Sequence, residues 1–518
     1  MSLLFSPRLL LRRLQAAHAL NPSHFRAAFL ALLAVVLVGM SLKYAAKVSR
    51  PGDDGKQTRS AFLRWRGMIR DLFAGENIYI GVNEYPNPPI MAAVLRPFAE
   101  LPPVTGAMAW FYAKVLMAAL SAVWAFRMVA PLADARGSPG STQDSVLRTQ
   151  PVPAGSSISA GSPTSAGSPA PAGSPTPERT ASTEYSVLGT QYSAVPDAAK
   201  ALAILFTLPP LLGDLSHNNV NIFILFLVAA CLEAYRRGWD IASGLVLALS
   251  IACKVTPLLF VAYFAWKRAW RVLAGCGVGL VLWLFVVPGL VYGWGRNAEL
   301  LESWYRLMVR PAVVENRVTS EHPNQSLPGA VYRLLTHRPS FIEYDKTPQG
   351  DIPRPAGFHN LADITTDAAR WVVKGLLAGF GLLVVLLCRT RRGERQGLRF
   401  AAECSLIVLG MLLFSERTWK HHAVTLLFPF AVIAYALAAV ELAPRARTLL
   451  VSVLVVVGVL TVGSGMLPSR AADLAMVYGI YTAAFLLLTA GVCIVLANLP
   501  RPVAIGYADT HEPIHPSP

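Results

Sequence analysis

The chain has 518 residues, of which 54% are apolar and only 15% are charged, and its mean hydropathy is +0.46. These values exclude an ordinary soluble globular protein and indicate an integral membrane protein. The formal net charge of +16 could suit nucleic acid, but the Lys and Arg residues form short runs between apolar spans, which is typical of loops anchored on the cytoplasmic side of a membrane.

The N-terminal part predicts a membrane anchor followed by an outer loop. Residues 1–26 are basic and indicate a cytoplasmic arm. The apolar run that begins at residue 27 is too long for a signal-peptide core and lacks a cleavage site, so it predicts a retained transmembrane helix. The loop at 59–103 then lies outside, and its apolar residues recur at helical spacing, which predicts an amphipathic surface helix. A second short helix is predicted between the proline pairs at 88–89 and 102–103.

The remaining organisation follows from the apolar runs and the loops between them. Residues 27–131 comprise a first transmembrane helix, the outer loop and a second transmembrane helix. Residues 132–197 are rich in Ser, Gly, Pro and Ala and predict a disordered insert. A transmembrane bundle with a large outer loop at 293–366 occupies 198–497, and 498–518 form a tail. About twelve spans place both termini in the cytoplasm, and the basic clusters fall in loops assigned to that side of a plasma membrane.

Polar clusters that anchoring does not explain fall on the outer face in this topology. They are the loop at 59–103, GDLSHNNVN at 213–221, Lys254 with Thr256 and Pro257, EHPNQS at 321–326, and SERTWKHH at 415–422. Separate segments that gather on one face predict a shared site.

Simpler interpretations of these residues stay open. Lys254 at a helix end is also consistent with a side chain that snorkels to the membrane interface. His421 and His422 are also consistent with interfacial anchors, and Asn219 and Asn221 with helix caps. The six cysteines lie in or beside apolar stretches without CxxC spacing, so we expect neither a metal site nor a disulfide framework.

The order of the motifs resembles a known family. Over about residues 26–440 the chain reads FAGENIY, YPNPPIMAAVLRPFAELPP, an Asn-rich turn, ASGLVLALSIACKVTPLLF, PNQSLPGAVYRLL and SERTWKHHAVTLLFP. This order resembles the polyprenol-phosphate-mannose-dependent mannosyltransferases of glycosyltransferase family 87, in the GT-C superfamily. The resemblance implies an all-α polytopic membrane protein, a GT-C-like bundle of about 12 transmembrane helices with amphipathic surface helices in the first outer loop.

The resemblance also implies an activity. It implies a hexosyltransferase that moves a mannose-like hexose from a polyprenyl-phosphate donor to a hydroxyl of a lipid or glycan acceptor, on the extracytoplasmic face, with inversion and without a cofactor. Cations would stabilise the charge that develops on the lipid phosphate. The candidates for this role are Lys254, Arg417, Lys420, His421 and His422. The candidates for substrate binding are Tyr85, Asn87, Asn219, Asn221, Asn324 and Gln325.

The catalytic base is where the chain departs from the family. The acceptor hydroxyl needs a carboxylate within hydrogen-bond reach, and family members place an Asp where this chain has Ser60, Ala61 and Phe62. We therefore predict Asp54 or Asp71 as the base. The alternatives are a transporter or flippase for a lipid-linked or phosphorylated substrate, and an inactive binder of a lipid-linked sugar.

Overall fold

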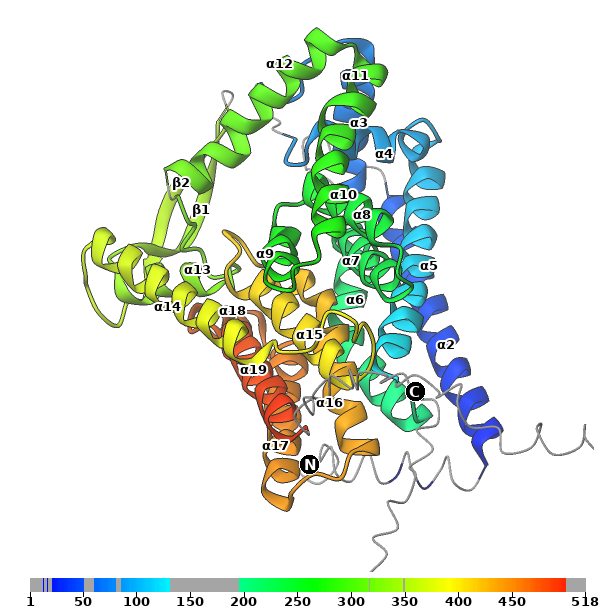
Figure 1. Ribbon diagram of the computed structural model, residues 1–518. Helices are drawn as coiled ribbons and strands as arrows, with labels where there is room; N and C mark the ends of the chain where they lie inside the picture. Colours follow the sequence, from blue (N-terminus) through cyan, green and yellow to red (C-terminus); the bar gives the residue numbers. More distant parts are fainter. Residues whose placement is uncertain are drawn as a thin grey trace, which may run out of the picture. The chain divides into compact units, whose positions relative to one another are not determined.

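The structure is a computed structural model that describes residues 13, 16, 21–50, 60–80, 85–130, 195–315, 317–347 and 350–499 (Figure 1). Residues 1–131 and 194–518 form one compact unit, and residues 132–193 form a second. Most of the predicted arm at 1–26, nearly all of the predicted insert at 132–197 and most of the tail at 498–518 lie outside the described residues, as does Asp54. The predictions for them stay predictions.

The first outer loop contains both of the helices that its sequence predicts. The N-terminal elements are α2 (Pro22–Val48), α3 (Ala61–Ala74), α4 (Pro89–Ala99) and α5 (Pro103–Val129). The amphipathic helix is confirmed, because α3 buries Phe62, Trp65, Ile69 and Leu72 on one face. It ends at Gly75, whose φ of 116° is left-handed backbone that glycine adopts readily.

A broken helix follows in the middle of the chain. The next elements are α6 (Asp197–His217), α7 (Asn221–Arg236), α8 (Asp240–Cys253), the 3-10 turn η1 (Thr256–Leu258), α9 (Leu259–Trp266), α10 (Trp270–Val281), the π-helical η2 (Leu282–Val286) and α11 (Val287–Tyr292). Lys254 after α8 is extended, with φ −158° and ψ 125°. Pro257 has no backbone N–H to continue the helix, so α8 and α9 are separate helices.

The long loop contains the one β-structure in the described residues. Its elements are α12 (Trp294–Trp304), the π-helical η3 (Tyr305–Val314), α13 (Leu327–Leu335), β1 (Pro339–Thr347) and β2 (Gly350–Phe358). The two strands pair antiparallel, with Ile342 opposite Pro355 and Thr347 opposite Gly350. The mostly helical architecture is confirmed, and this hairpin is its departure from the all-α prediction.

The C-terminal part completes the helical unit. Its elements are α14 (Thr366–Leu387), α15 (Leu398–Leu413), the 3-10 segment η4 (Lys420–Leu426), α16 (Leu427–Ala439), α17 (Pro444–Gly458), the π-helical η5 (Val459–Gly463), α18 (Ser469–Val477) and α19 (Ile480–Asn498). In the described part of the chain, eight helical stretches are long and apolar enough to cross a membrane. Further predicted spans are shorter helices, such as α7 and α15 with 16 residues each and α8 with 14.

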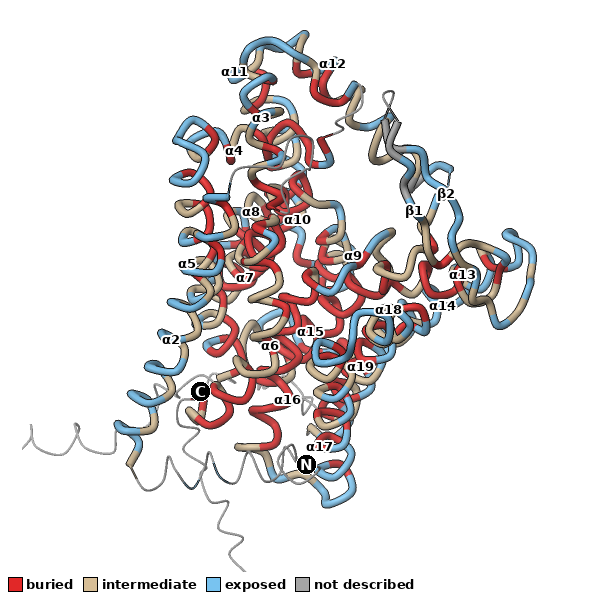
Figure 2. The backbone as a smooth tube through the Cα atoms, turned by 180° about the vertical axis from the view of Figure 1, so that it is seen from behind, coloured by how far each residue is buried: buried red, intermediate tan, exposed pale blue. Residues whose placement is uncertain are grey.

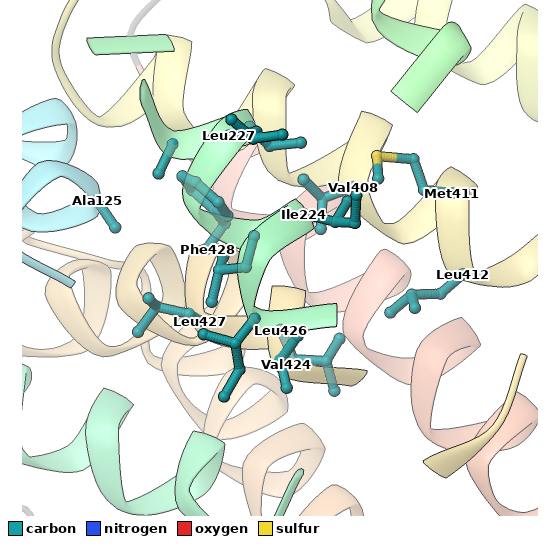
Figure 3. Packing of buried hydrophobic residues seen from close by; sticks show 14 of the residues in the cluster. Ala125, Ile224, Leu227, Val408, Met411, Leu412, Val424, Leu426, Leu427 and Phe428 are labelled. Carbon is teal, nitrogen blue, oxygen red and sulfur yellow. The ribbon is translucent and has the colours of Figure 1, made fainter. Parts of the chain in front are cut away.

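The most deeply buried helices are α15 and α16. Nearly every residue of α15 is buried, whereas α14 buries only Ala369 (Figure 2). Side chains of α7, α15 and η4, among them Ile224, Met411 and Val424, pack against one another in this core (Figure 3). Helices in a bilayer associate through such close packing, because lipid is as apolar as their side chains.

The segments predicted to be cytoplasmic bind one another. Arg236 Nη1 donates to Gln396 Oε1 over 2.9 Å, and Gln396 Nε2 donates to the carbonyl of Ala130 over 2.9 Å. Lys267 Nζ donates to the carbonyl of Cys388 over 3.1 Å. The connection between α14 and α15 therefore binds both the end of α7 and the end of α9.

The segments predicted to be outside are also linked to one another. Arg296 of α12 donates to the carbonyl of Leu72 in the first loop over 3.2 Å. Ser60 and Asn218 both hydrogen-bond the hydroxyl of Tyr44, over 2.8 Å and 2.7 Å. Further hydrogen bonds join Lys254 to the segment 213–221, that segment to 415–422, and 415–422 to 321–326. The polar segments predicted on one face therefore come together.

Candidate functional site

Lys254 is held by a polar partner inside the bundle. Its Nζ donates to Asn221 Oδ1 over 2.8 Å, and Asn221 Nδ2 donates to Asp214 Oδ1 over 2.9 Å. Asn221 begins α7, and Asp214 lies in the last turns of α6. The break after α8 therefore directs the ammonium of Lys254 toward two other helices, and the interpretation as a snorkelling side chain does not describe it.

Asp214, the acceptor for Asn221, is also one partner of a buried ion pair. Lys114 Nζ of α5 lies 3.1 Å from Asp214 Oδ2, and both side chains are 0% exposed. A lone charge at this depth would be costly, so each group requires the other. Sequence reasoning did not single out Asp214, although a carboxylate in the apolar run before LSHNNVN is a signal of a buried partner.

The two histidines have different surroundings. Asn219 Nδ2 lies 3.3 Å from His421 Nε2, and the rings of His421 and His217 have centroids 5.0 Å apart. The backbone N–H of Trp419 donates to His422 Nδ1 over 3.3 Å. Because Nδ1 accepts this bond, the neutral imidazole of His422 carries its proton on Nε2 and can donate from there.

Lys254 and His422 line the same small cavity. Its lining consists of Asn221, Ile224, Lys254, Thr256, Met411, Leu412, Ser415, Thr418, His422 and Thr425. Its apolar side, with Ile224, Met411 and Leu412, belongs to the core shown in Figure 3. The cavity measures about 20 Å³, room for about one water molecule. A sugar phosphate therefore fits only if the surrounding loops open.

A second and much larger cavity shares one lining segment with the first. It measures about 630 Å³. Its lining consists of Leu307, Met308, Pro311, Glu315, Arg317, Val318, Thr319, Arg338, Thr366, Arg370, Glu416 and Arg417. The segment 415–418 contributes to both cavities, with Ser415 and Thr418 at the small one and Glu416 and Arg417 at the large one.

Three of the five residues predicted to face the donor phosphate do not line the small cavity. Arg417 lines the large one, Lys420 is exposed at the start of η4, and the ring of His421 lies 4.9 Å from that of His422 without lining the cavity. The structure thus brings the ammonium of Lys254 and the imidazole of His422 to one cavity.

Asn324 and Gln325 hold the segment 415–418 in place. Asn324 Nδ2 donates to the carbonyl of Glu416 and its Oδ1 accepts from the N–H of Thr418, both over 2.9 Å. Gln325 Nε2 donates to the carbonyl of Met476 over 2.8 Å. Both amides are 0% exposed and their N–H donors are used by backbone groups, so they position the loop and do not face a ligand.

Tyr85 and Asn87 are buried in the first outer loop. The Tyr85 hydroxyl and Asn87 Nδ2 have no hydrogen-bond partner among the described residues. Burial raises the pKa of Tyr85. Its ring packs against the rings of Trp65 and Tyr79, whose centroids lie 6.0 Å and 6.1 Å away.

Of the two carboxylates predicted as the base, the structure describes only Asp71. Asp71 is exposed on the face of α3 opposite to its buried residues and lines neither cavity. Asp54 lies outside the described residues. Glu416 lines the large cavity, and its neighbours Ser415 and Thr418 line the small one. Burial raises the pKa of Glu416, although nearby Arg417 opposes the shift. This carboxylate lies within SERTWKHH but was not among those predicted as the base.

Comparisons with known proteins point to the family that the motifs resemble. The sequence model of glycosyltransferase family 87 matches residues 178–416. A polyprenol-phosphate-mannose-dependent alpha-(1-2)-phosphatidylinositol mannoside mannosyltransferase of Mycolicibacterium smegmatis is 27% identical over 146 residues, which are 28% of this chain and 31% of the relative. Over these residues the chain is similar to glycosyltransferase family 87. The aligned stretch spans about a third of that relative's length.

The family 87 match contains most of the site. It includes Asp214, Asn221, Lys254 and Glu416, and it ends just before Arg417. A crystal structure of ArnT from Cupriavidus metallidurans bound to undecaprenyl phosphate matches the chain loosely. It has 13% sequence identity and a TM-score of 0.38, over 91% of this chain and 78% of that chain. In the described part of the chain, no three His, Cys, Asp or Glu side chains cluster as metal ligands.

Proposed function

We propose that the protein is a membrane hexosyltransferase that moves a mannose-like hexose from a polyprenyl-phosphate donor to an acceptor hydroxyl on the extracytoplasmic face, with inversion. The observation that carries the proposal is the convergence of Lys254 and His422 on one cavity at a helix break. The relative from Mycolicibacterium smegmatis is named as dependent on polyprenol-phosphate-mannose, which supports the choice of donor.

The donor phosphate is proposed to bind at Lys254. When the bond between the sugar C1 and the phosphate oxygen breaks, the electron pair stays on the phosphate, and a fixed ammonium stabilises this charge more than water does. His422 Nε2–H adds a second donor, and His421 and Asn219 extend the polar surface. The polyprenyl tail of the bound donor is proposed to extend between transmembrane helices into the bilayer.

The acceptor hydroxyl needs a base on the opposite side of the sugar ring. Its oxygen attacks C1 while a carboxylate takes its proton, so the products are the glycoside and the polyprenyl phosphate. Glu416 is the candidate that the geometry favours over Asp71, because it lies in the loop shared by both cavities. Asp54 remains a candidate from the sequence. Tyr85 and Asn87, with their unsatisfied polar atoms, are candidates to bind the sugar.

The orientation in the membrane is part of the proposal. The basic loops that share partners around Gln396 are proposed to face the cytoplasm, together with both termini, and the two cavities the outside of the cytoplasmic membrane. An excess of Lys and Arg in short loops sets such an orientation.

One observation favours a second candidate function. A helix broken at a buried cation is also typical of transporters, so transport of a lipid-linked substrate is the alternative to transfer. The two functions differ in whether the bond between sugar and phosphate is broken. An inactive binder would retain the donor and do neither.

The test uses the full chain purified in dodecyl maltoside or in lipid vesicles. Polyprenyl-phosphate mannose with a radiolabelled sugar is added together with a membrane lipid extract as acceptor. We expect the label to move from the donor to an acceptor product. Replacing Lys254 by Ala should lower the rate by about a hundredfold, the usual effect of losing one preorganised charge-stabilising donor, and His422→Gln by about tenfold.

A matched control is Lys374→Ala, which removes an exposed lysine of α14 that lies over the Trp371 ring, and it should leave the rate unchanged. Full activity in both site variants would overturn the site assignment. Label that crosses sealed vesicles while still attached to its lipid would show transport in place of transfer.

A further inference from the structure

The large cavity has an excess of positive charge that the protein does not neutralise. Four arginines and two glutamates line it. The arginines come from four separate places: after η3, before β1, in α14 and in the loop before η4. Glu315 is already paired, with Arg317 over 3.0 Å and with Arg310 over 3.2 Å. Glu416 is thus the one lining carboxylate for which no ion pair is found among the described residues.

Two of the arginines have donors left for a ligand. Arg370 Nε is buried and has no hydrogen-bond partner in the described part of the chain, although Nη1 of the same side chain lies 3.1 Å from Asp367 Oδ1. No carboxylate of the described residues lies within ion-pair distance of Arg417. A buried guanidinium N–H without an acceptor is costly, so the site favours an anion that supplies one.

The chemistry of the lining favours a phosphate group. A guanidinium is a planar fork that binds two oxygens of one phosphate at once, and several such forks around one cavity suit a tetrahedral oxyanion. Thr366, the first residue of the 22-residue helix α14, also lines the cavity, so the positive end of a helix dipole adds to the arginines. At about 630 Å³ the cavity has room for a sugar or polyol attached to that phosphate.

We propose that this cavity binds a phosphate or phosphodiester group of the acceptor. The inference rests on the proposed function and adds the chemical class of the second substrate. The segment 415–418 connects the two cavities, so an acceptor anchored by its phosphate at Arg370 and Arg417 would present a hydroxyl toward Lys254, with Glu416 beside it. Neutral sugars without a phosphate would lack this anchor.

The test measures binding and therefore does not depend on turnover. The full chain in dodecyl maltoside, a phosphate-free detergent, is titrated by calorimetry with glycerol 3-phosphate and, in parallel, with glycerol. We expect the phosphate to bind and glycerol not to bind. Arg370→Gln and Arg417→Gln should each weaken glycerol 3-phosphate about tenfold, as expected for the loss of a charge-assisted hydrogen bond.

The matched control is Arg354→Gln, because Arg354 is an exposed arginine of the same outer region that pairs with Glu343 over 2.6 Å. It should leave the affinity unchanged. Absence of binding, or equal affinity in the wild type and in both cavity variants, would overturn the proposal.

A second titration separates this cavity from the donor site. Undecaprenyl phosphate should bind equally well to Arg370→Gln and to the wild type, and less well to Lys254→Ala. If Arg370→Gln weakens both probes alike, the cavity belongs to the donor phosphate and the proposal is wrong. Phosphatidylglycerol added to the micelles distinguishes the sources: displacement of glycerol 3-phosphate assigns the phosphate to a lipid headgroup, and no displacement assigns it to a soluble molecule. Failure of sugar transfer would leave these binding results intact, so the two proposals fail separately.

Discussion

Replacing Asp214 by Asn tests the ion pair beneath the site. The variant keeps an oxygen for the hydrogen bond from Asn221 but removes the charge that faces Lys114 over 3.1 Å. At an effective dielectric constant of about 20, two unit charges at this distance attract by about 5 kcal/mol. Both side chains are 0% exposed, so no water replaces the lost partner. We therefore expect the variant to lose about 3–5 kcal/mol of stability.

Unfolding in mixed micelles of dodecyl maltoside and dodecyl sulfate measures this loss. The double variant Lys114→Met with Asp214→Asn removes both charges and should recover most of the stability, because the cost comes from one charge left alone. The control Glu343→Gln breaks an ion pair whose side chains are about 60% exposed and should cost less than about 1 kcal/mol. A single variant as stable as the wild type, or a double variant no better than the single one, would refute the reasoning.

Two further predictions concern the loop between the cavities. Asn324→Ala removes both contacts that hold Glu416 and Thr418, so it should lower the transfer rate and cost about 1–3 kcal/mol of stability in the same unfolding assay. The control Asn360→Ala loses a 3.0 Å hydrogen bond within its own loop and should keep the transfer rate. An unchanged rate in Asn324→Ala would contradict the positioning role. Burial raises the pKa of Glu416, and a base works only when deprotonated, so the rate should fall as the pH drops through a value above the ordinary pKa of 4.5. Glu416→Gln should abolish most of the rate, and a pH profile that is the same in this variant would exclude Glu416 as the base.

The local features of the fold were predictable because local chemistry determines them. The apolar spacing in α3 and the proline pairs on either side of α4 act within a few residues, and both predictions agree with the structure. The hairpin was not predictable in this way. Strand β2 contains Pro353 and Pro355, which cannot donate to a ladder and interrupt the pattern that indicates a strand.

The sequence predicted where the candidate site lies better than it predicted which side chains bind one another there. Motif order pointed to Lys254 and His422, and both line one cavity. The partners of polar side chains depend on distant segments: Lys114 and Asp214 are 100 residues apart, and Asn324 binds a carbonyl 92 residues away. A single sequence does not reveal such pairings, which is why the amides at 324 and 325 were expected at the substrate.

The segment from Ser415 to Thr418 is a wall common to the two cavities: its end residues line the small one and its two middle residues line the large one. A ligand that displaced this wall from one cavity would therefore change the shape of the other. Kinetic order and synergy between two substrates would then arise from four consecutive residues, without any movement of the surrounding helices.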